Sequence, residues 1–194
     1  VTAAERGHAV TLFEAGPAIG GQLNLARAVP GKEEFDELLR YFRTRVAELG
    51  VQLRLNQRPV AAELAAAPAG AGTGGFDRVV VATGVRARKP EIAGIDHPKV
   101  IGYAELLSGR RAAGRRVAVI GAGGIGFDVA EYLTQSGPSG AVAPEVFNAE
   151  WGIDTTYAGR GGLATPAPER PARQVALLQG RVFKFATGPT CKAD

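Results

Sequence analysis

This chain of 194 residues has little of the usual reactive chemistry: one cysteine, two histidines and no methionine. The single cysteine, Cys191, excludes an internal disulfide and cannot hold an iron–sulfur cluster alone, which fits a reducing cytoplasm. No apolar run approaches the roughly 20 residues that span a bilayer, and the first residues lack the pattern of a signal peptide. We therefore expect a cytoplasmic protein that has no membrane partner.

Charge and polar side chains argue against several other classes of protein. The net charge of +4 is modest, and the densest basic cluster, within residues 110–116, is typical of a solvated loop rather than of a nucleic-acid patch. His8 and His97 have no neighbours that would suggest a metal site or a catalytic triad. We predict no metal site, no nucleic-acid partner and no catalytic residue of the chain's own. The oligomeric state is not fixed by these features.

The most informative motif is a Gly-x-Gly-x-x-Gly sequence that lies between a short β-branched run and a helical apolar pattern. Gly121 would allow a tight turn, Gly123 would let the backbone approach a phosphate, and Gly126 would let helix and strand pack closely. The N–H groups and the positive dipole end of the helix would face the anion. The motif predicts a dinucleotide pyrophosphate site, and an ordinary α/β turn is the alternative.

A second nucleotide-type signal lies near the start of the chain. Residues 2–7 read as the end of a helix that closes at Gly7, and residues 8–14 read as a strand that ends in Glu14. In a dinucleotide fold such an acid accepts hydrogen bonds from a ribose, about 20 residues after a first glycine turn. That distance runs off the N-terminus, and there is no initial methionine. We therefore expect a truncated sequence, and a plain strand-end acid is the alternative for Glu14.

Between these signals the chain alternates between helical and strand patterns. Apolar residues at spacings of three and four predict an amphipathic helix over residues 32–49, which Gly50 would close. The other expected elements are a strand at 51–55, a helical turn at 63–67, a buried parallel strand at 76–84, and a strand after the insertion at 137–173. Trp151, inside that insertion, is expected to be a packing anchor, and stacking on a cofactor is the alternative.

The order of the glycine-rich features indicates two dinucleotide-binding units. The acid Glu14 is followed by a Gly-Gly-Gln loop at residues 20–22, by Ala-Thr-Gly at 82–84, and then by the second glycine turn. A small residue and a glycine at the end of a parallel strand leave room for a cofactor. We predict an α/β fold of two incomplete Rossmann-like units with parallel sheets flanked by helices. Residues 1–107 would form the first partial unit and residues 108–194 the second.

Several uncommon strings in this chain occur in the same order in a known family. These strings are residues 13–16, 20–26, 30–35, 95–100, 123–130, 150–154, 161–163 and 175–179. Through them, residues 1–179 resemble the C-terminal half of NADPH-dependent 2,4-dienoyl-CoA reductases, which are relatives of trimethylamine dehydrogenase and the old yellow enzyme group. The resemblance implies that residues 1–107 are a partial FAD unit, that residues 108–194 are a partial NAD(P) unit, and that electrons pass from NADPH to FAD. The family's FMN barrel and iron–sulfur cluster match nothing here.

The resemblance also implies roles for individual residues. Glu14 would hold the FAD ribose, Gly21 and Gln22 would contact the FAD, and Lys32 would lie close by, unless it is simply a solvated lysine. The remaining implied contacts are Pro59 and Val60 at the adenine, Ala82, Thr83 and Gly84 on the flavin side, and Gly121, Gly123, Gly124 and Gly126 at the NADPH pyrophosphate.

The end of the chain departs from the family after Gln179. The expected basic pair is missing, so Arg181 is the only local candidate for the NADPH 2′-phosphate. The resemblance therefore leaves alternatives open: a reductase fragment that is inactive alone, a truncated remnant with weak nucleotide binding, or the nucleotide half of a related amine dehydrogenase or NADH:flavin oxidoreductase.

Overall fold

The computed structural model describes residues 1–65, 75–179 and 182–186, which fall into two compact units. Unit 1 comprises Val1–Gln22 and Glu37–Arg88, and unit 2 comprises Leu23–Asp36 and Lys89–Asp194. The chain therefore leaves unit 1, contributes a short segment to unit 2, returns, and then completes unit 2. The predicted boundary at residue 107 divides the chain by the cofactor that each part would bind, not by compactness. It stays a prediction.

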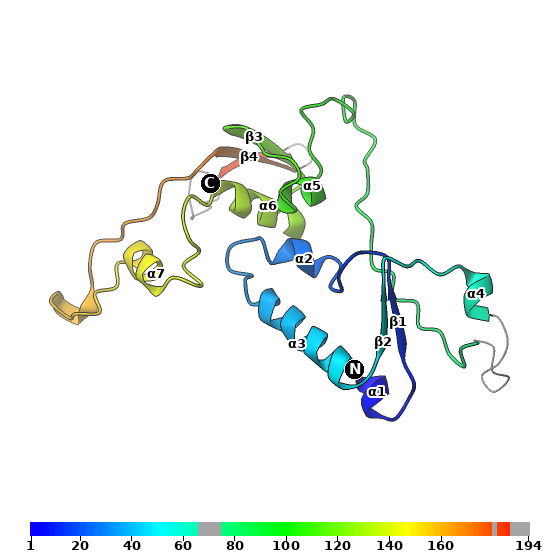
Figure 1. Cartoon of the computed structure of the whole chain (residues 1–194). Helices are drawn as coiled ribbons and strands as arrows, with labels where there is room; N and C mark the ends of the chain where they lie inside the picture. Colours follow the sequence, from blue (N-terminus) through cyan, green and yellow to red (C-terminus); the bar gives the residue numbers. More distant parts are fainter. Residues whose placement is uncertain (66–74, 180–181, 187–194) are drawn as a thin grey trace. The chain divides into compact units, whose positions relative to one another are not determined.

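Unit 1 is built on a two-stranded parallel sheet (Figure 1). Its elements are α1 (Thr2–Glu5), β1 (Thr11–Glu14), α3 (Phe35–Glu48, which begins at the end of the unit 2 segment), β2 (Gln52–Leu55) and α4 (Ala61–Ala65). Thr11 lies opposite Gln52, and Glu14 lies opposite Leu55. A parallel pair needs a crossover, and α3 lies in the connection between the two strands.

The sequence predicted α3 well because its signals are local. Leu39 and Val46, seven residues apart on the apolar stripe, are its buried residues. Gly50 follows the helix with φ of 64°, a left-handed conformation that L side chains rarely adopt and that commonly ends a helix. The expected helix over 32–49 is confirmed, with a start at Phe35.

Unit 2 contains a three-stranded sheet in the order β3-β4-β5. Its elements are α2 (Leu23–Ala26), α5 (Tyr103–Leu107), β3 (Arg116–Ile120), α6 (Gly124–Thr134), α7 (Pro144–Trp151), the 3₁₀ turn η1 (Arg160–Gly162), β4 (Gln174–Gln179) and β5 (Val182–Ala186). β3 and β4 are parallel, with Ile120 opposite Leu178, whereas β5 runs antiparallel to β4. The parallel sheets and their helices confirm the predicted α/β fold class.

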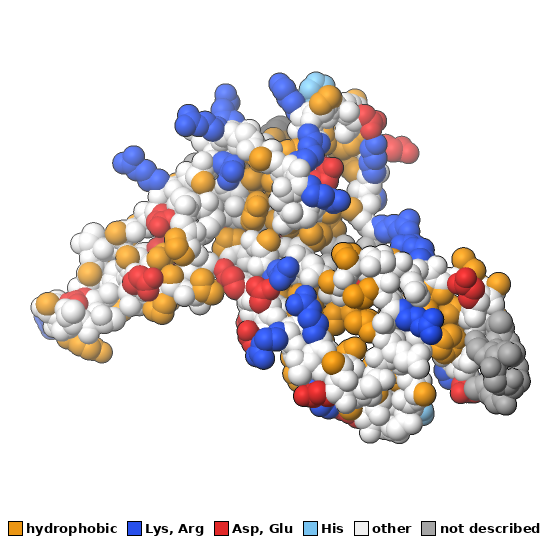
Figure 2. Space-filling view, in the orientation of Figure 1, with side chains coloured by type: hydrophobic (Ala, Val, Ile, Leu, Met, Phe, Trp, Pro, Cys, Tyr) orange, Lys and Arg blue, Asp and Glu red, His pale blue; other side chains and the backbone are white. Residues whose placement is uncertain are grey.

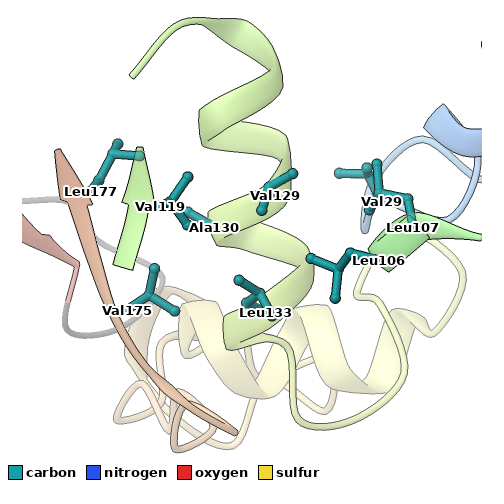
Figure 3. Close-up of a cluster of buried hydrophobic side chains, with 9 residues drawn as sticks. All are labelled: Val29, Leu106, Leu107, Val119, Val129, Ala130, Leu133, Val175 and Leu177. Carbon is teal, nitrogen blue, oxygen red and sulfur yellow. The ribbon is translucent and has the colours of Figure 1, made fainter. Parts of the chain in front are cut away.

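The apolar core of unit 2 surrounds α6 (Figure 3). Its buried members come from the segment before α3, from α5, from α6 and from the two parallel strands: Val29, Leu106, Leu107, Val119, Val129, Ala130, Leu133, Val175 and Leu177. Leu133 is only 1% exposed, and full burial of a leucine side chain contributes about 1.5–3 kcal/mol. The core therefore fixes α6 against β3 and β4.

One predicted strand is absent. Residues 76–84 have the β-branched composition of a buried parallel strand but form no strand, and Val80 is 87% exposed. A strand needs a neighbour to accept its backbone hydrogen bonds, and among the described residues no strand pairs with this segment. Composition indicates that a segment can enter a sheet, whereas the pairing decides whether it does.

The expectation for Trp151 is also wrong. Its side chain lies at the end of α7, is 67% exposed, and lies beside the ring of Phe147 at 6.0 Å between centroids. Apolar side chains are visible elsewhere on the surface as well (Figure 2).

Among the described residues, no helix combines the length and the apolar character needed to cross a membrane.

Candidate functional site

The predicted glycine turn lies at the carboxyl end of β3, where α6 begins. Gly121 follows the strand with φ of 113°, a conformation open to glycine, and its N–H donates to the carbonyl of Leu178 at 2.8 Å. This bond joins the turn to the neighbouring parallel strand β4. Gly123 is the N-cap of α6, and the helix starts at Gly124. The sequence signal therefore corresponds to a strand, a tight turn and a helix start.

Gly126 allows α6 to lie directly on this turn. A Cβ at Gly126 would be 1.8 Å from the carbonyl oxygen of Gly121, which is well inside contact distance, and 3.6 Å from Cδ1 of Leu177. The nearest atoms belong to the backbone and cannot rotate away. Close packing of helix and strand thus requires glycine here, as the motif predicts.

Gly123 and Gly124 have the opposite surroundings. Both are exposed, and a Cβ added to either would meet no atom within 4 Å. The first N–H groups of a helix have no acceptor within the helix, and the helix dipole is positive at this end. The open space over these two glycines can therefore receive an anion such as a pyrophosphate. The residues present fit the phosphates of a dinucleotide.

Unit 1 holds the predicted ribose acid in a defined position. Glu14 ends β1, and its Oε1 accepts a hydrogen bond from the N–H of Gly16 at 2.7 Å. The backbone of the same turn is tied to the residues after β2, because Asn56 N–H donates to the carbonyl of Gly16 at 2.9 Å. The carboxylate therefore lies at the carboxyl edge of the sheet, where open α/β folds bind their ligands.

The structure brings the Gly-Gly-Gln loop next to the Ala-Thr-Gly segment. Nε2 of Gln22 lies 3.4 Å from the carbonyl oxygen of Val85, a long hydrogen bond. Gly21 adopts φ of 48° and Gly84 adopts φ of 68°, so both use the left-handed region. Ala82, Thr83 and Gly84 are exposed. These two predicted parts of the FAD site are adjacent within unit 1.

The predicted adenine contacts lie at the start of α4. The N–H of Val60 donates to Oε2 of Glu63 at 3.0 Å, and this bond ties Val60 to the first turn of the helix. Val60 is 59% exposed, and Pro59 is half-buried. Their contact with adenine stays a prediction. Arg181, the candidate for the 2′-phosphate, lies outside the described residues.

Lys32 belongs to unit 2, the unit that also contains the glycine turn. Its Nζ is 2.6 Å from Oδ1 of Asp128 on α6, and the side chains are 35% and 28% exposed. Asp128 could not be identified from the sequence, because the two residues are 96 positions apart and no local pattern connects them. The expected proximity of Lys32 to FAD stays a prediction.

Glu131 interacts electrostatically with both members of this ion pair and with Glu33. Partial burial and the charge of Asp128 raise the pKa of Glu131 above its ordinary value, with a further contribution from Glu33, whereas Lys32 lowers it. Oε2 of Glu33 is buried and accepts no hydrogen bond. In the part of the chain that the structure describes, no group of three or more His, Cys, Asp and Glu residues is arranged to hold a metal ion.

Comparisons with known proteins place the chain among flavin and pyridine-nucleotide enzymes. Residues 1–146 match the model of the family described as "Pyridine nucleotide-disulphide oxidoreductase". Over 135 residues, which are 70% of the chain, it is 36% identical to the metal reductase of Desulforamulus reducens and 38% identical to the bilirubin reductase of Mediterraneibacter gnavus. Both alignments cover 20% of the relative, so the chain spans about a fifth of the length of these curated relatives.

A solved structure to which the chain is similar is also that of a reductase. The chain is similar to a 2-naphthoyl-CoA reductase, solved in complex with 2-naphthoyl-CoA, with a TM-score of 0.56 and 31% identity. The match covers 67% of this chain and 19% of the reductase.

Proposed function

Since the chain belongs to the pyridine nucleotide-disulphide oxidoreductase family, we propose that it forms the part of a larger reductase that receives electrons from NADPH and passes them to FAD. When bound, the nicotinamide supplies a hydride and the flavin accepts it. The chain's own residues bind and orient the two cofactors. The observation that carries the proposal is the turn formed by residues 121–126, with its helix start open over Gly123 and Gly124 and its tight packing at Gly126.

We assign the parent enzyme to the 2,4-dienoyl-CoA reductase type. The 2-naphthoyl-CoA reductase shares a thioester substrate class with it, as its name states. The relatives named for bilirubin and for metals reduce quite different acceptors. A segment common to such different reductases is best explained as the electron-input part, with the acceptor bound elsewhere in the protein.

The preference for NADPH rests on the end of β4. In a dinucleotide unit, an acid at the end of the second strand accepts hydrogen bonds from the ribose and repels a 2′-phosphate. The corresponding strand here, β4, ends in the neutral Gln179. A neutral residue here does not repel a 2′-phosphate, and this supports the choice of NADPH as the nucleotide.

The test is the substitution Gly123→Val. The backbone of Gly123 is extended, with φ of −86° and ψ of −176°, and the space beside it is open, so valine fits the fold. The valine side chain would occupy the space that the phosphates need. NADPH affinity, measured by calorimetry, should fall at least tenfold, and NADH should bind more weakly than NADPH to the unsubstituted chain.

The matched control is Gly114→Val. Gly114 also lies in unit 2, is exposed, and would meet no atom within 4 Å of a new Cβ. This variant should bind NADPH with unchanged affinity. Equal NADPH affinity in Gly123→Val and Gly114→Val would refute the assignment of the glycine turn.

A further inference from the structure

We infer that Lys32 is a positioning residue for the nicotinamide nucleotide, because it neutralises Asp128, whose negative charge would otherwise repel the pyrophosphate. This inference rests on the proposed function and assigns Lys32 to the NADPH side of the reaction. The observation behind it is the 2.6 Å ion pair between Lys32 and Asp128 on the helix that starts at the glycine turn.

Asp128 lies one helical turn after Gly124. Residues four apart share a helix face, and the rise between them is about 6 Å along the axis. Helical side chains lean toward the N-terminus of their helix. Asp128 therefore lies on the helix face that it shares with Gly124, about 6 Å along the axis from the start of α6, where the helix N-terminus would receive the phosphates. An unpaired negative charge at this point opposes anion binding.

Lys32 is held in place for this role by its own segment. Val29 is fully buried in the core around α6, and Figure 3 shows its side chain facing Val129. The N–H of Lys32 donates to the carbonyl of Val29 at 3.1 Å, and the N–H of Gly31 donates to Oγ of Ser139 at 3.2 Å. These contacts fix the backbone from which the lysine reaches Asp128.

The charges around α6 show why a cation is needed. Asp128 and Glu33 both raise the pKa of Glu131, and Lys32 is the group that opposes them. Without Lys32, the charges of Asp128 and Glu33 would act on Glu131 with no opposing cation among the groups that shift its pKa. A pyrophosphate would then approach a region of negative potential. With Lys32 in place, the charge of Asp128 is neutralised. The positive end of the helix dipole then determines the electrostatic potential at the turn.

The experiment measures NADPH affinity of the chain by calorimetry in three variants. Lys32→Met removes the cation, Asp128→Asn removes the anion, and both break the same ion pair. Lys89→Met is the matched control, because Lys89 forms an exposed ion pair with Asp96 in the same unit. Each measurement is made at about 0.02 M and at about 0.5 M salt, because salt screens charge interactions over distances beyond the Debye length.

We expect Lys32→Met to weaken NADPH binding about fivefold at low salt, with the difference shrinking to less than twofold at high salt. Asp128→Asn should bind NADPH at least as tightly as the unsubstituted chain, because the repulsive charge is gone and the cation remains. Lys89→Met should match the unsubstituted chain. A purely structural role of the ion pair would instead weaken binding in both Lys32→Met and Asp128→Asn, at either salt concentration.

Two results would overturn the inference alone: unchanged NADPH affinity in Lys32→Met, or equal weakening of NADPH binding in Lys32→Met and Asp128→Asn. FAD affinity of Lys32→Met is measured in the same way, and weakened FAD binding beside unchanged NADPH affinity would assign Lys32 to the flavin. If the unsubstituted chain binds no NADPH, the proposed function is wrong and the inference falls with it. The two failures are therefore distinguishable.

Discussion

The substitution Gly126→Ala gives the most quantitative test of how α6 meets the glycine turn. An alanine Cβ would lie 1.8 Å from the carbonyl oxygen of Gly121 and 2.8 Å from its carbonyl carbon. A carbon and a carbonyl oxygen in contact are about 3.3 Å apart, so the helix and the turn would have to separate by about 1.5 Å. Both are backbone, so no side-chain rotation can absorb this shift.

The expected cost follows from the rigidity of this contact. Inserting atoms into a packed site usually costs about 1–3 kcal/mol, and more where the backbone must move. We expect about 3 kcal/mol here, which for a chain of this size lowers the melting temperature by about 6–12 °C. The same shift moves the start of α6 away from β3. NADPH affinity should therefore fall together with stability.

The assay is thermal unfolding followed by circular dichroism, with Gly124→Ala as control. Gly124 is two residues away on the same helix, and an alanine Cβ there would meet no atom within 4 Å. Alanine is a better helix former than glycine, so the control should melt at or slightly above the temperature of the unsubstituted chain. If Gly126→Ala melts within about 2 °C of Gly124→Ala, α6 does not lie on the turn as described.

The sequence predicted those parts of the fold whose signals are local. The apolar spacing of α3 and the step from strand to turn to helix around Gly121 both involve neighbouring residues, and both agree with the structure. The helix closures at Gly7 and Gly50 agree for the same reason, because each glycine adopts a positive φ just beyond its helix. Short-range geometry alone fixes such features.

What the sequence could not predict depends on residues far apart in the chain. Residues 76–84 have strand composition, but a strand also needs a partner, and composition does not supply one. The pairing of Lys32 with Asp128 is set by the return of residues 23–36 to unit 2, which no periodicity shows. Trp151 is exposed because α7 buries none of its residues, a property of tertiary packing.

Two further predictions concern titrating carboxyl groups. Hydrogen bonds from Thr156 and Gly159 lower the pKa of Asp154 from 3.8 to about 2, so its stabilising contribution is complete above about pH 4 and is lost as the pH falls through 2. Asp154→Asn should remove the acid-induced change in the fluorescence of the single tryptophan over that range, and an unchanged transition would contradict this. Burial and Asp128 raise the pKa of Glu131 above 4.5, so its ionisation costs stability once the pH rises above that value. Glu131→Gln should therefore raise the melting temperature at pH 7 and have little effect at pH 4, where the carboxyl is largely protonated in both states. An equal rise at both pH values would show that the gain comes from packing and that the carboxylates beside α6 do not repel one another.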